Sequence, residues 1–260
     1  MFDASYEVNN IVKFIRNYYT KNNLKGVVLG ISGGKDSAVV AALFCKAIGS
    51  ENVLGVTLPC HSLEIDKTDA QKVSEKFNFE LINIDLTNTY DCFINEINKL
   101  GNFSEEELKN SNINIKPKLR MSSLYYLAQL YSQLKGGTYI VAGTSNKSEL
   151  YVGYFTKGGD STYDIGVLND YTVDEVIKIG KYLEVPESII NKIPSDGLSQ
   201  MSDEEKLGVK YKDIELYMKN EIKEGKIKDK IEELHKSSLH KFNIPVYKRD
   251  EMNYDNKRDW

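Results

Sequence analysis

The chain has 260 residues, 41% of them hydrophobic and 28% charged, a composition typical of a soluble globular protein of one large domain or two small ones. Its formal net charge of −4 provides no overall basic surface, which argues against nucleic acid as the main partner. No apolar run approaches the roughly 20 residues that cross a bilayer, and the N-terminus MFDASYEVNN lacks a signal-peptide pattern. We therefore expect a cytoplasmic protein with no membrane partner.

The cysteines and histidines indicate neither a disulfide framework nor a metal site built from these residues. Cys45, Cys60 and Cys92 lie far apart without a CxxC pair, so we expect free, buried thiols. Cys60 and His61 are adjacent in sequence, and adjacent side chains rarely face each other on a strand or a helix. A catalytic dyad at these two residues is therefore not expected.

The first two predicted elements are an amphipathic helix and a buried strand. Apolar residues between Val8 and Tyr19 recur at helical spacing, and Ser5 precedes them as the expected N-cap. Residues 26–31 are predicted to form the strand. A second helix follows the strand after a short loop and is predicted to end at Gly49.

The sequence GISGGKDS, from Gly30 to Ser37, joins that strand to that helix. A glycine loop at such a junction points backbone N–H groups and the positive end of the helix dipole at its contents, which favours a phosphate. Gly33 and Gly34 let the backbone approach an anion closely, and Lys35 adds a charge. The loop is neither a Walker A nor a Rossmann GxGxxG motif, because the glycines and the residue after the lysine do not match those patterns. The alternative is an ordinary glycine turn.

Strands and helices alternate through the next hundred residues. The pattern predicts strands at 53–58 and 80–84, a helix at 66–77, a polar helical stretch at 88–110, a long helix at 116–134 and a strand at 138–142. This alternation predicts an α/β fold with a doubly wound, mostly parallel sheet and helices on both faces. Ligands bind such sheets at the carboxyl ends of the strands, where the glycine loop lies.

A second strand-end loop, GTSNKSE from Gly143 to Glu149, follows the last of these strands. Thr144 and Glu149 provide a hydroxyl and a carboxylate suited to a nucleotide and its metal, with a solvated helix cap as the alternative. The glycine-rich stretch GYFTKGGDSTYD at residues 153–164 has no periodicity and is either a surface loop or an active-site lid.

Helical patterns dominate the last third of the chain. Capping boxes that begin at Thr172 and Ser202 predict the starts of two helices, with the turn-rich stretch 193–200 between them. Lys and Glu alternate over residues 219–236 on an expected exposed helix. The lone Trp260 suggests that the C-terminal tail docks on the protein.

The motif SGGKDS resembles the PP-loop of the ATP pyrophosphatase superfamily, which splits ATP into AMP and pyrophosphate. GISGGKDS, NIKPKLRM, AGTSNKSE, VGYFTKGGD and PSDGL, with HK before Pro245, occur in the order found in NAD synthetases. The chain resembles their ammonia-dependent form over almost its whole length, which implies an adenine nucleotide alpha hydrolase-like fold. Glutamine-dependent members carry an additional nitrilase-like domain, whereas residues 1–260 are expected to form a single synthetase domain without it.

The resemblance implies sites for two substrates, ATP and deamido-NAD. Asp36 and Glu149 would bind Mg²⁺, since carboxylates are suitable hard ligands for this cofactor. The residues implied in ATP binding are Gly30, Ile31, Ser32, Gly33, Gly34, Lys35, Asp36, Ser37, Thr144 and Ser195. Cationic partners suit the pyrophosphate and the carboxylate of deamido-NAD, and the residues implied in its binding are Arg120, Lys157, Asp164, His240 and Lys241, with Lys118 as a further candidate.

Two positions depart from the family pattern. Val173 stands where the family usually has a lysine that reaches ATP, so another group must supply that charge or ATP binds more weakly. The loop reads TKGGDSTYD in place of the usual TKYGDGG, which loses an aromatic residue and two glycines and leaves the closure of the lid open.

The implied reaction is the amidation of a carboxylate by way of an acyl-adenylate. Lys35, the loop amides and Mg²⁺ held by Asp36 would stabilise the charge on departing pyrophosphate, and ammonia would then displace AMP. No side-chain nucleophile is needed. Asp160 is the candidate acceptor for a proton from ammonium, with capping of its own turn as the alternative. The resemblance also suggests a homodimer.

The sequence leaves two other functions open. One is another PP-loop enzyme, either an AMP-forming amidase or a tRNA-modifying adenylating enzyme, and the latter would be expected to show a basic surface or a CxxC pair. The other is a non-catalytic nucleotide sensor. The presence of Lys35, Asp36 and Glu149 argues against a sensor, and Val173 favours it slightly.

Overall fold

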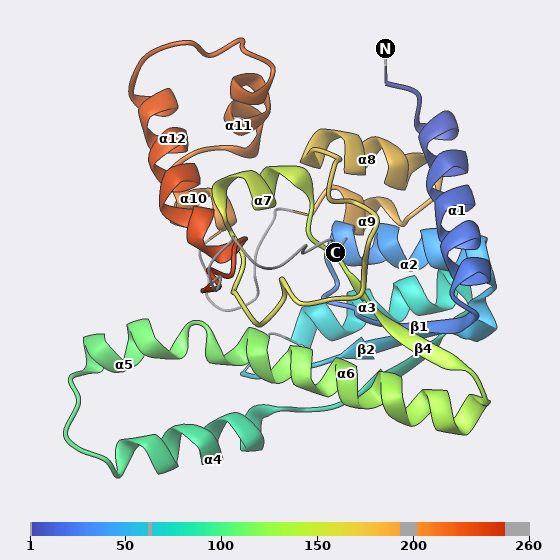
Figure 1. Cartoon of the computed structure of the whole chain (residues 1–260), viewed down its shortest axis with the longest axis horizontal. Helices are drawn as coiled ribbons and strands as arrows, with labels where there is room; N and C mark the ends of the chain where they lie inside the picture. Colours follow the sequence, from blue (N-terminus) through green and yellow to red (C-terminus); the bar gives the residue numbers. More distant parts are fainter. Residues whose placement is uncertain (1, 62–63, 193–201, 248–260) are drawn as a thin grey trace, which may run out of the picture.

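Five parallel strands form one sheet at the centre of the protein (Figure 1). The computed structural model describes residues 2–61, 64–192 and 202–247, and within these the strand order is β3-β2-β1-β4-β5. The strands are β1 (Leu24–Gly30), β2 (Val53–Thr57), β3 (Glu80–Asn83), β4 (Thr138–Gly143) and β5 (Ile165–Gly166). The predicted doubly wound parallel sheet is confirmed. The sequence did not predict β5, because two residues are too few to show a periodic pattern.

The chain reverses its course across the sheet at β1. From β1 it moves outward through β2 to β3, and it then returns to place β4 on the other side of β1. Val28 of β1 therefore pairs with Leu54 on one side and with Val141 on the other. Loops that follow β1 and β4 diverge at such a point and leave a crevice at the carboxyl ends of the strands, where ligands bind in open α/β sheets.

One face of the sheet is covered by α1 (Ala4–Lys21), α2 (Lys35–Ile48), α3 (Glu64–Phe77), α8 (Val173–Tyr182) and α9 (Glu187–Ile190). Side chains alternate along a strand, so Val27 and Leu29 of β1 point to these helices and are fully buried. α1 packs here through the apolar stripe that its periodicity predicted. The burial of this stripe, more than helix propensity, holds α1 on the sheet.

The start of α1 differs from the prediction. Its N-cap is Asp3, whose carboxylate accepts a hydrogen bond from the Tyr6 amide at 3.1 Å. Ser5 lies inside the first turn and donates from its hydroxyl to Tyr182 instead, so the prediction of Ser5 as the cap was wrong. The end of α2 at Gly49 was predicted correctly.

The opposite face of the sheet is covered by α6 (Ile115–Lys135), while α4 (Thr87–Asn98) and α5 (Glu105–Asn112) extend away from the sheet (Figure 1). Val28 and Val141 point to this side and belong to the same apolar cluster as Leu127 of α6. α6 ends at Gly136, whose φ of 64° is left-handed and favours glycine. The polar stretch predicted as helical forms two separate helices.

The C-terminal third forms a smaller helical layer against α7 (Lys147–Val152). It comprises α10 (Asp203–Leu207), α11 (Tyr211–Met218), α12 (Lys226–Ser238) and the 3₁₀ turn at Leu239–Lys241. Val152, Ile214 and Ile231 meet in its own apolar cluster. Both predicted capping boxes are present. A single helix over 219–236 was wrong, because Asn220 and Gly225 take positive φ values of 60° and 99° and separate α11 from α12.

The three thiols differ in exposure. Cys60 is buried and Cys45 is partly buried, but Cys92 is exposed, so the expectation of burial was wrong for Cys92. The His61 ring lies 2.8 Å from Asp91, and Cys60 points to the Leu86 carbonyl, so the two neighbours do not form a dyad. No helix in the described part of the chain is long and apolar enough to cross a membrane. Trp260 lies outside the described residues.

Candidate active site

The glycine loop connects β1 to α2 and is closed by its own hydroxyl groups. Gly33 takes a φ of 75°, which favours glycine. The Gly34 amide donates to the Ser32 hydroxyl at 3.3 Å, and the Ser37 hydroxyl donates to the Gly34 carbonyl at 3.0 Å. The loop therefore holds the N-terminus of α2 at the carboxyl edge of the sheet, where its amides and dipole favour an anion.

Lys35 and Asp36 occupy the first turn of α2 and are largely removed from solvent. Lys35 is only 5% exposed, and its ammonium lies 3.3 Å from the Asp36 carboxylate. A buried pair of this kind contributes little to stability because its desolvation offsets the attraction. Its position in a phosphate-type loop is better explained by ligand chemistry.

Asn146 links the loop after β1 to the loop after β4. Its side chain is fully buried and donates to the Asp36 carboxylate at 3.0 Å. Asn146 also caps α7. Its side-chain oxygen accepts from the Glu149 backbone amide at 3.1 Å, and its own backbone amide donates to the Glu149 carboxylate at 3.2 Å. The sequence prediction missed Asn146, although the N-x-x-E capping pattern from 146 to 149 was a signal for it.

The surroundings of the Glu149 carboxylate disfavour its negative charge, although the residue is only partly buried. Burial raises the pKa of Glu149 well above its ordinary value, and the nearby charge of Asp36 raises it further. The Asn146 amide and Lys35 oppose this rise. Two carboxylates in this situation favour a cation between them, and Mg²⁺ typically takes one or two carboxylates together with phosphate oxygens. Among the residues described, no group of three or more His, Cys, Asp or Glu side chains is placed to hold a metal without such a ligand.

A cleft of about 1170 Å³ opens beside the glycine loop. Lys35 forms part of one wall, and α8 and the α10–α11 region form the others, through residues that include Val173, Lys210, Tyr211 and Lys212. A cleft of this size is sufficient for a nucleotide. The cleft therefore extends from the start of α2 into a pocket between α8 and the C-terminal helical layer.

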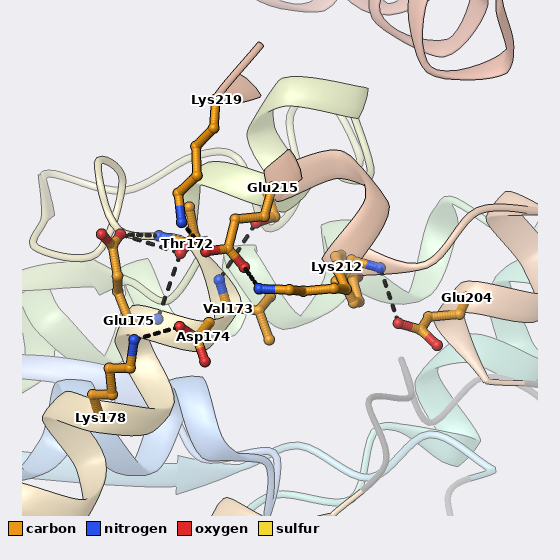
Figure 2. A network of polar contacts seen from close by, with 11 residues as sticks. Thr172, Val173, Asp174, Glu175, Lys178, Glu204, Lys212, Glu215 and Lys219 are labelled. Carbon is orange, nitrogen blue, oxygen red and sulfur yellow. Dashed lines mark hydrogen bonds and ion pairs between the residues drawn. The ribbon is translucent and has the colours of Figure 1, made fainter. Parts of the chain in front are cut away.

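The N-terminus of α8 lines this cleft with Val173, where the family pattern has a lysine. Figure 2 shows Lys212 and Lys219 converging on Glu215 above this point, with ammonium-to-carboxylate distances of 3.3 and 2.6 Å. Glu215 is 3% exposed and carries one charge against two ammonium groups. Asp174 is paired with Lys178 at 2.6 Å. The Glu175 carboxylate, which accepts from the Thr172 amide at 2.8 Å, adds a third negative charge, so these three lysines and three carboxylates leave no net positive charge beside Val173.

The loop 153–164 and the segment around His240 lie against each other. The Lys157 ammonium donates to the His240 carbonyl at 2.9 Å, and the Lys241 ammonium donates to the Gly153 and Phe155 carbonyls at 2.7 and 2.9 Å. Lys157, His240 and Lys241, which the sequence resemblance grouped, are thus brought together although more than 80 residues separate the two segments.

Asp160 and the start of α6 join this group. The Asp160 carboxylate accepts from the Thr156 amide at 2.7 Å. It therefore caps its own turn, which was the alternative role given for Asp160 from the sequence. The Thr156 hydroxyl donates to Asn114 at 2.8 Å and ties the loop to the NIKPKLRM segment. Asp160 is exposed, yet the protein packed around its carboxylate raises the pKa of Asp160. The hydrogen bond from the Thr156 amide and the positive charges of Lys241 and Arg120 lower this pKa in part.

Arg120 and Asp164 lie at the sheet edge. Arg120 donates from Nε to the Leu58 carbonyl at 3.1 Å, just beyond β2. Asp164 accepts from the Val141 amide at 2.8 Å and from the Tyr125 hydroxyl at 3.1 Å, so its carboxylate is fixed between β4 and α6. Lys118 is exposed and Thr144 is partly buried just after β4. Ser195 lies outside the described residues.

The fold is that of an α/β protein in which two strand-end loops meet at the switch point of a parallel sheet, an arrangement typical of nucleotide-binding proteins. The family model for NAD synthase matches residues 7–253. The chain belongs to the NAD synthase family, and the assignment made from its sequence segments is confirmed.

Similar proteins cover nearly the whole chain. It is 38% identical over 249 residues to the NH(3)-dependent NAD(+) synthetase of Mycoplasmopsis pulmonis, covering 95% of this chain and 91% of that protein. It is 40% identical over 243 residues to the NH(3)-dependent NAD(+) synthetase of Methanocaldococcus jannaschii, covering 92% and 86%. The solved NMN synthetase of Francisella tularensis matches with a TM-score of 0.86 at 31% identity, covering 96% of this chain and 100% of that one. The NH3-dependent NAD synthetase of Campylobacter jejuni matches with a TM-score of 0.75 at 28% identity, covering 95% and 100%.

Proposed function

We propose that the protein is an enzyme that amidates the nicotinate carboxylate of deamido-NAD with ammonia, consuming ATP and releasing NAD, AMP and pyrophosphate. The observation that carries this proposal is the hydrogen bond of 3.0 Å from Asn146 to Asp36. It joins the anion-type loop after β1 to the acidic loop after β4, so that a polyphosphate and a divalent cation would meet at the switch point. Relatives named as NH(3)-dependent NAD(+) synthetases support the same reaction.

The reaction needs two steps because oxide is too poor a leaving group for direct amidation of a carboxylate. In the first, a carboxylate oxygen attacks the α-phosphorus of ATP, and the bond from that phosphorus to pyrophosphate breaks. In the second, ammonia attacks the acyl carbon, and AMP leaves with the bridging oxygen and its electron pair. A base takes the proton that the new amide nitrogen loses.

The negative charge that develops on pyrophosphate would be stabilised by groups that are already in position. The amides of residues 30–37 and the Lys35 ammonium stabilise this charge without rearrangement, which is the most effective form of electrostatic catalysis. Mg²⁺ held by Asp36 and Glu149 would neutralise part of it and orient the phosphates. We assign further contacts with ATP to Thr144 and Ser195.

The second substrate is assigned to the group at the edge of the sheet. Arg120, Lys157 and Lys241 supply positive charge for the pyrophosphate and the carboxylate of a dinucleotide. Asp164 is held rigid by Val141 and Tyr125, which suits it to accept from a ribose hydroxyl or an amide. His240 completes the proposed set.

The proposal is tested with purified protein, ATP, MgCl₂ and deamido-NAD, with either ammonium or glutamine as nitrogen donor. We expect NAD, AMP and pyrophosphate in equal amounts with ammonium and none with glutamine. ATP that binds without turnover would instead identify a sensor, and efficient use of glutamine would contradict the ammonia-dependent assignment. We place this reaction in the cytoplasm, with no nucleic-acid or membrane partner.

A second candidate substrate is nicotinate mononucleotide. The observation that favours it is the match to the NMN synthetase of Francisella tularensis, whose TM-score exceeds that of the Campylobacter jejuni NAD synthetase. Both substrates present the same nicotinate carboxylate, so the chemistry above would apply to either. Initial rates measured with each substrate over a range of concentrations decide between them through the ratio of the two kcat/KM values.

We assign to Asp160 the acceptance of a proton from ammonium at the site, and its raised pKa suits it to a base. The substitution Asp160→Asn preserves an acceptor for the Thr156 amide, and we expect it to lower NAD formation about 100-fold at neutral pH. The loss should shrink as pH rises, because free ammonia replaces ammonium. Asp170→Asn, at an exposed carboxylate paired with Lys147, serves as the control. Unaltered turnover and an unaltered pH profile would remove Asp160 from this role.

We further propose a homodimer formed through α6. Tyr126, Leu130 and Leu134 are exposed and recur every four residues along this helix, so they form one apolar stripe. Phe93 and Ile97 on α4 are also exposed apolar residues, and α4 lies beside the α5–α6 arm of the molecule (Figure 1). Contiguous exposed apolar surface of this kind is typical of an interface between subunits.

The double substitution Leu130→Glu with Leu134→Glu should convert the dimer into a monomer. Two carboxylates placed in an apolar interface must lose their hydration on association, which weakens it by several orders of magnitude. Sedimentation velocity measures the change in mass. Phe14→Glu, at an equally exposed aromatic on α1, is the control and should leave the dimer intact. A wild-type monomer, or a variant that remains dimeric, would contradict the proposed interface.

A further inference from the structure

Tyr211 has a buried hydroxyl group without a hydrogen-bond partner. Among the described residues, the only other buried side-chain polar atom without a partner is Oδ1 of Asn169. Tyr211 is 4% exposed and is the first residue of α11, where its backbone amide donates to Glu204 at 2.9 Å. Its ring belongs to the apolar cluster of the C-terminal layer, so both ends of the residue are held in place. Orphaned buried hydroxyls are rare in native proteins and call for an explanation.

The surroundings of this hydroxyl are those of the proposed nucleotide site. Tyr211 and Lys35 line the same cleft. Burial raises the pKa of Tyr211, and the charges of Glu149, Asp203 and Asp36 raise it further, so the phenol stays protonated and able to donate at any physiological pH. Two of these carboxylates, Asp36 and Glu149, belong to the loops after β1 and β4, so Tyr211 lies near both loops.

The neighbouring carboxylates already have other donors. Asp36 accepts from the Asn146 side chain, and Glu149 accepts from the Asn146 amide. Asp203 accepts from the Tyr154 hydroxyl at 3.0 Å. The Tyr211 hydroxyl is therefore a fixed, buried donor without a protein acceptor in the described structure, on a residue that lines the cleft together with Lys35.

We propose that Tyr211 is a further nucleotide-binding residue, whose hydroxyl donates a hydrogen bond to a phosphate oxygen of the ATP polyphosphate in this cleft. The inference rests on the proposed function, because that function puts a polyphosphate beside Lys35. A phosphate oxygen is a charged acceptor, and a hydrogen bond to a charged acceptor is about twice as strong as one between neutral groups. A bound phosphate would thus supply the hydrogen-bond acceptor that the Tyr211 hydroxyl lacks in the described structure.

The test compares Tyr211→Phe with the wild-type protein. This substitution removes only an unsatisfied hydroxyl, so the thermal midpoint of the ligand-free protein should be unchanged or higher. Affinity for inorganic pyrophosphate, measured by calorimetry, should fall roughly 10- to 100-fold, both with and without MgCl₂, as expected for the loss of a hydrogen bond to a charged group. Tyr217→Phe on the same helix, whose hydroxyl donates to Glu232, is the matched control and should bind normally.

Pyrophosphate affinity within twofold of wild type, or a loss seen only when Mg²⁺ is present, would overturn the assignment to a phosphate oxygen. A second measurement does not depend on the variant folding. In wild-type protein carrying ¹³C-labelled tyrosine, the Tyr211 ring-carbon signal should shift on addition of pyrophosphate, and an unmoved signal would contradict the contact. Because these are binding measurements, they separate this inference from the proposed reaction, which the formation of NAD tests.

Discussion

The Asp36→Asn variant should form NAD about 10³-fold more slowly than the wild-type enzyme and should release pyrophosphate at a correspondingly low rate. Asparagine has the shape of aspartate and still accepts the hydrogen bond from Asn146, so the two strand-end loops should stay joined. What the substitution removes is one negative charge beside Lys35, and with it the proposed anchor for Mg²⁺ on the polyphosphate. A continuous assay of pyrophosphate release measures the first chemical step directly.

The control for this variant is Asp213→Asn, which removes a carboxylate that lines the same cleft but lies on α11, away from the loops. It should retain most of the wild-type rate. If Asp36→Asn releases pyrophosphate at the wild-type rate, Asp36 is not a magnesium ligand. A further expectation separates charge from shape: raising the concentration of MgCl₂ should recover part of the lost activity, since the weakened site can then be filled by mass action.

The anion-binding half of the site was predictable because its determinants are local. A strand, two glycines, a lysine and a helix start follow one another within GISGGKDS, and each favours the same geometry through backbone freedom or the helix dipole. The parallel sheet was predictable for a similar reason, since its strands and helices alternate in sequence. Local signals also placed both capping boxes and the ends of α2 and α6.

Contacts between distant segments could not be predicted in this way. Asn146 and Asp36 are 110 residues apart, and only the sheet order, with β4 beside β1, brings them within hydrogen-bond distance. The orphaned hydroxyl of Tyr211 has no sequence signal at all, because a missing partner is a property of packing. The break between α11 and α12 was missed because Lys and Glu alternate evenly through it. A charge pattern does not predict the positive φ values that end one helix and precede the next.

The charges around Val173 come from two helices that are distant in sequence. The sequence alone recorded the loss of a positive charge there. The structure places Lys212 and Lys219 near it, on a helix that begins 38 residues later, and Glu215 and Glu175 balance their two charges. The electrostatic character of the cleft therefore depends on α11, which no local comparison at Val173 could reveal.

Glu149→Gln should make the ligand-free protein more stable while removing most of its activity. An acid whose pKa is raised by folding destabilises the native state at every pH above its ordinary pKa, because the unfolded chain ionises more readily. Each unit of that rise corresponds to about 1.4 kcal/mol, and glutamine avoids this cost while still accepting from the Asn146 amide. Urea unfolding at neutral pH should therefore give a higher free energy of unfolding for the variant, and NAD formation should fall at least about 100-fold through loss of a proposed magnesium ligand.

The pH dependence identifies the cause of that gain in stability. As pH falls through the raised pKa, Glu149 takes up a proton in the native wild-type protein, and the advantage of the variant should shrink until it vanishes below the ordinary value of about 4.5. Glu205→Gln is the matched control, because Glu205 occupies the same capping-box position on α10 but is exposed, and the Ser202 amide lowers its pKa. This control should show no gain in stability and no loss of NAD formation. A Glu149→Gln protein that is less stable than wild type at neutral pH would mean that the carboxylate is satisfied within the fold, and the case for a cation beside Asp36 would then lose its electrostatic basis.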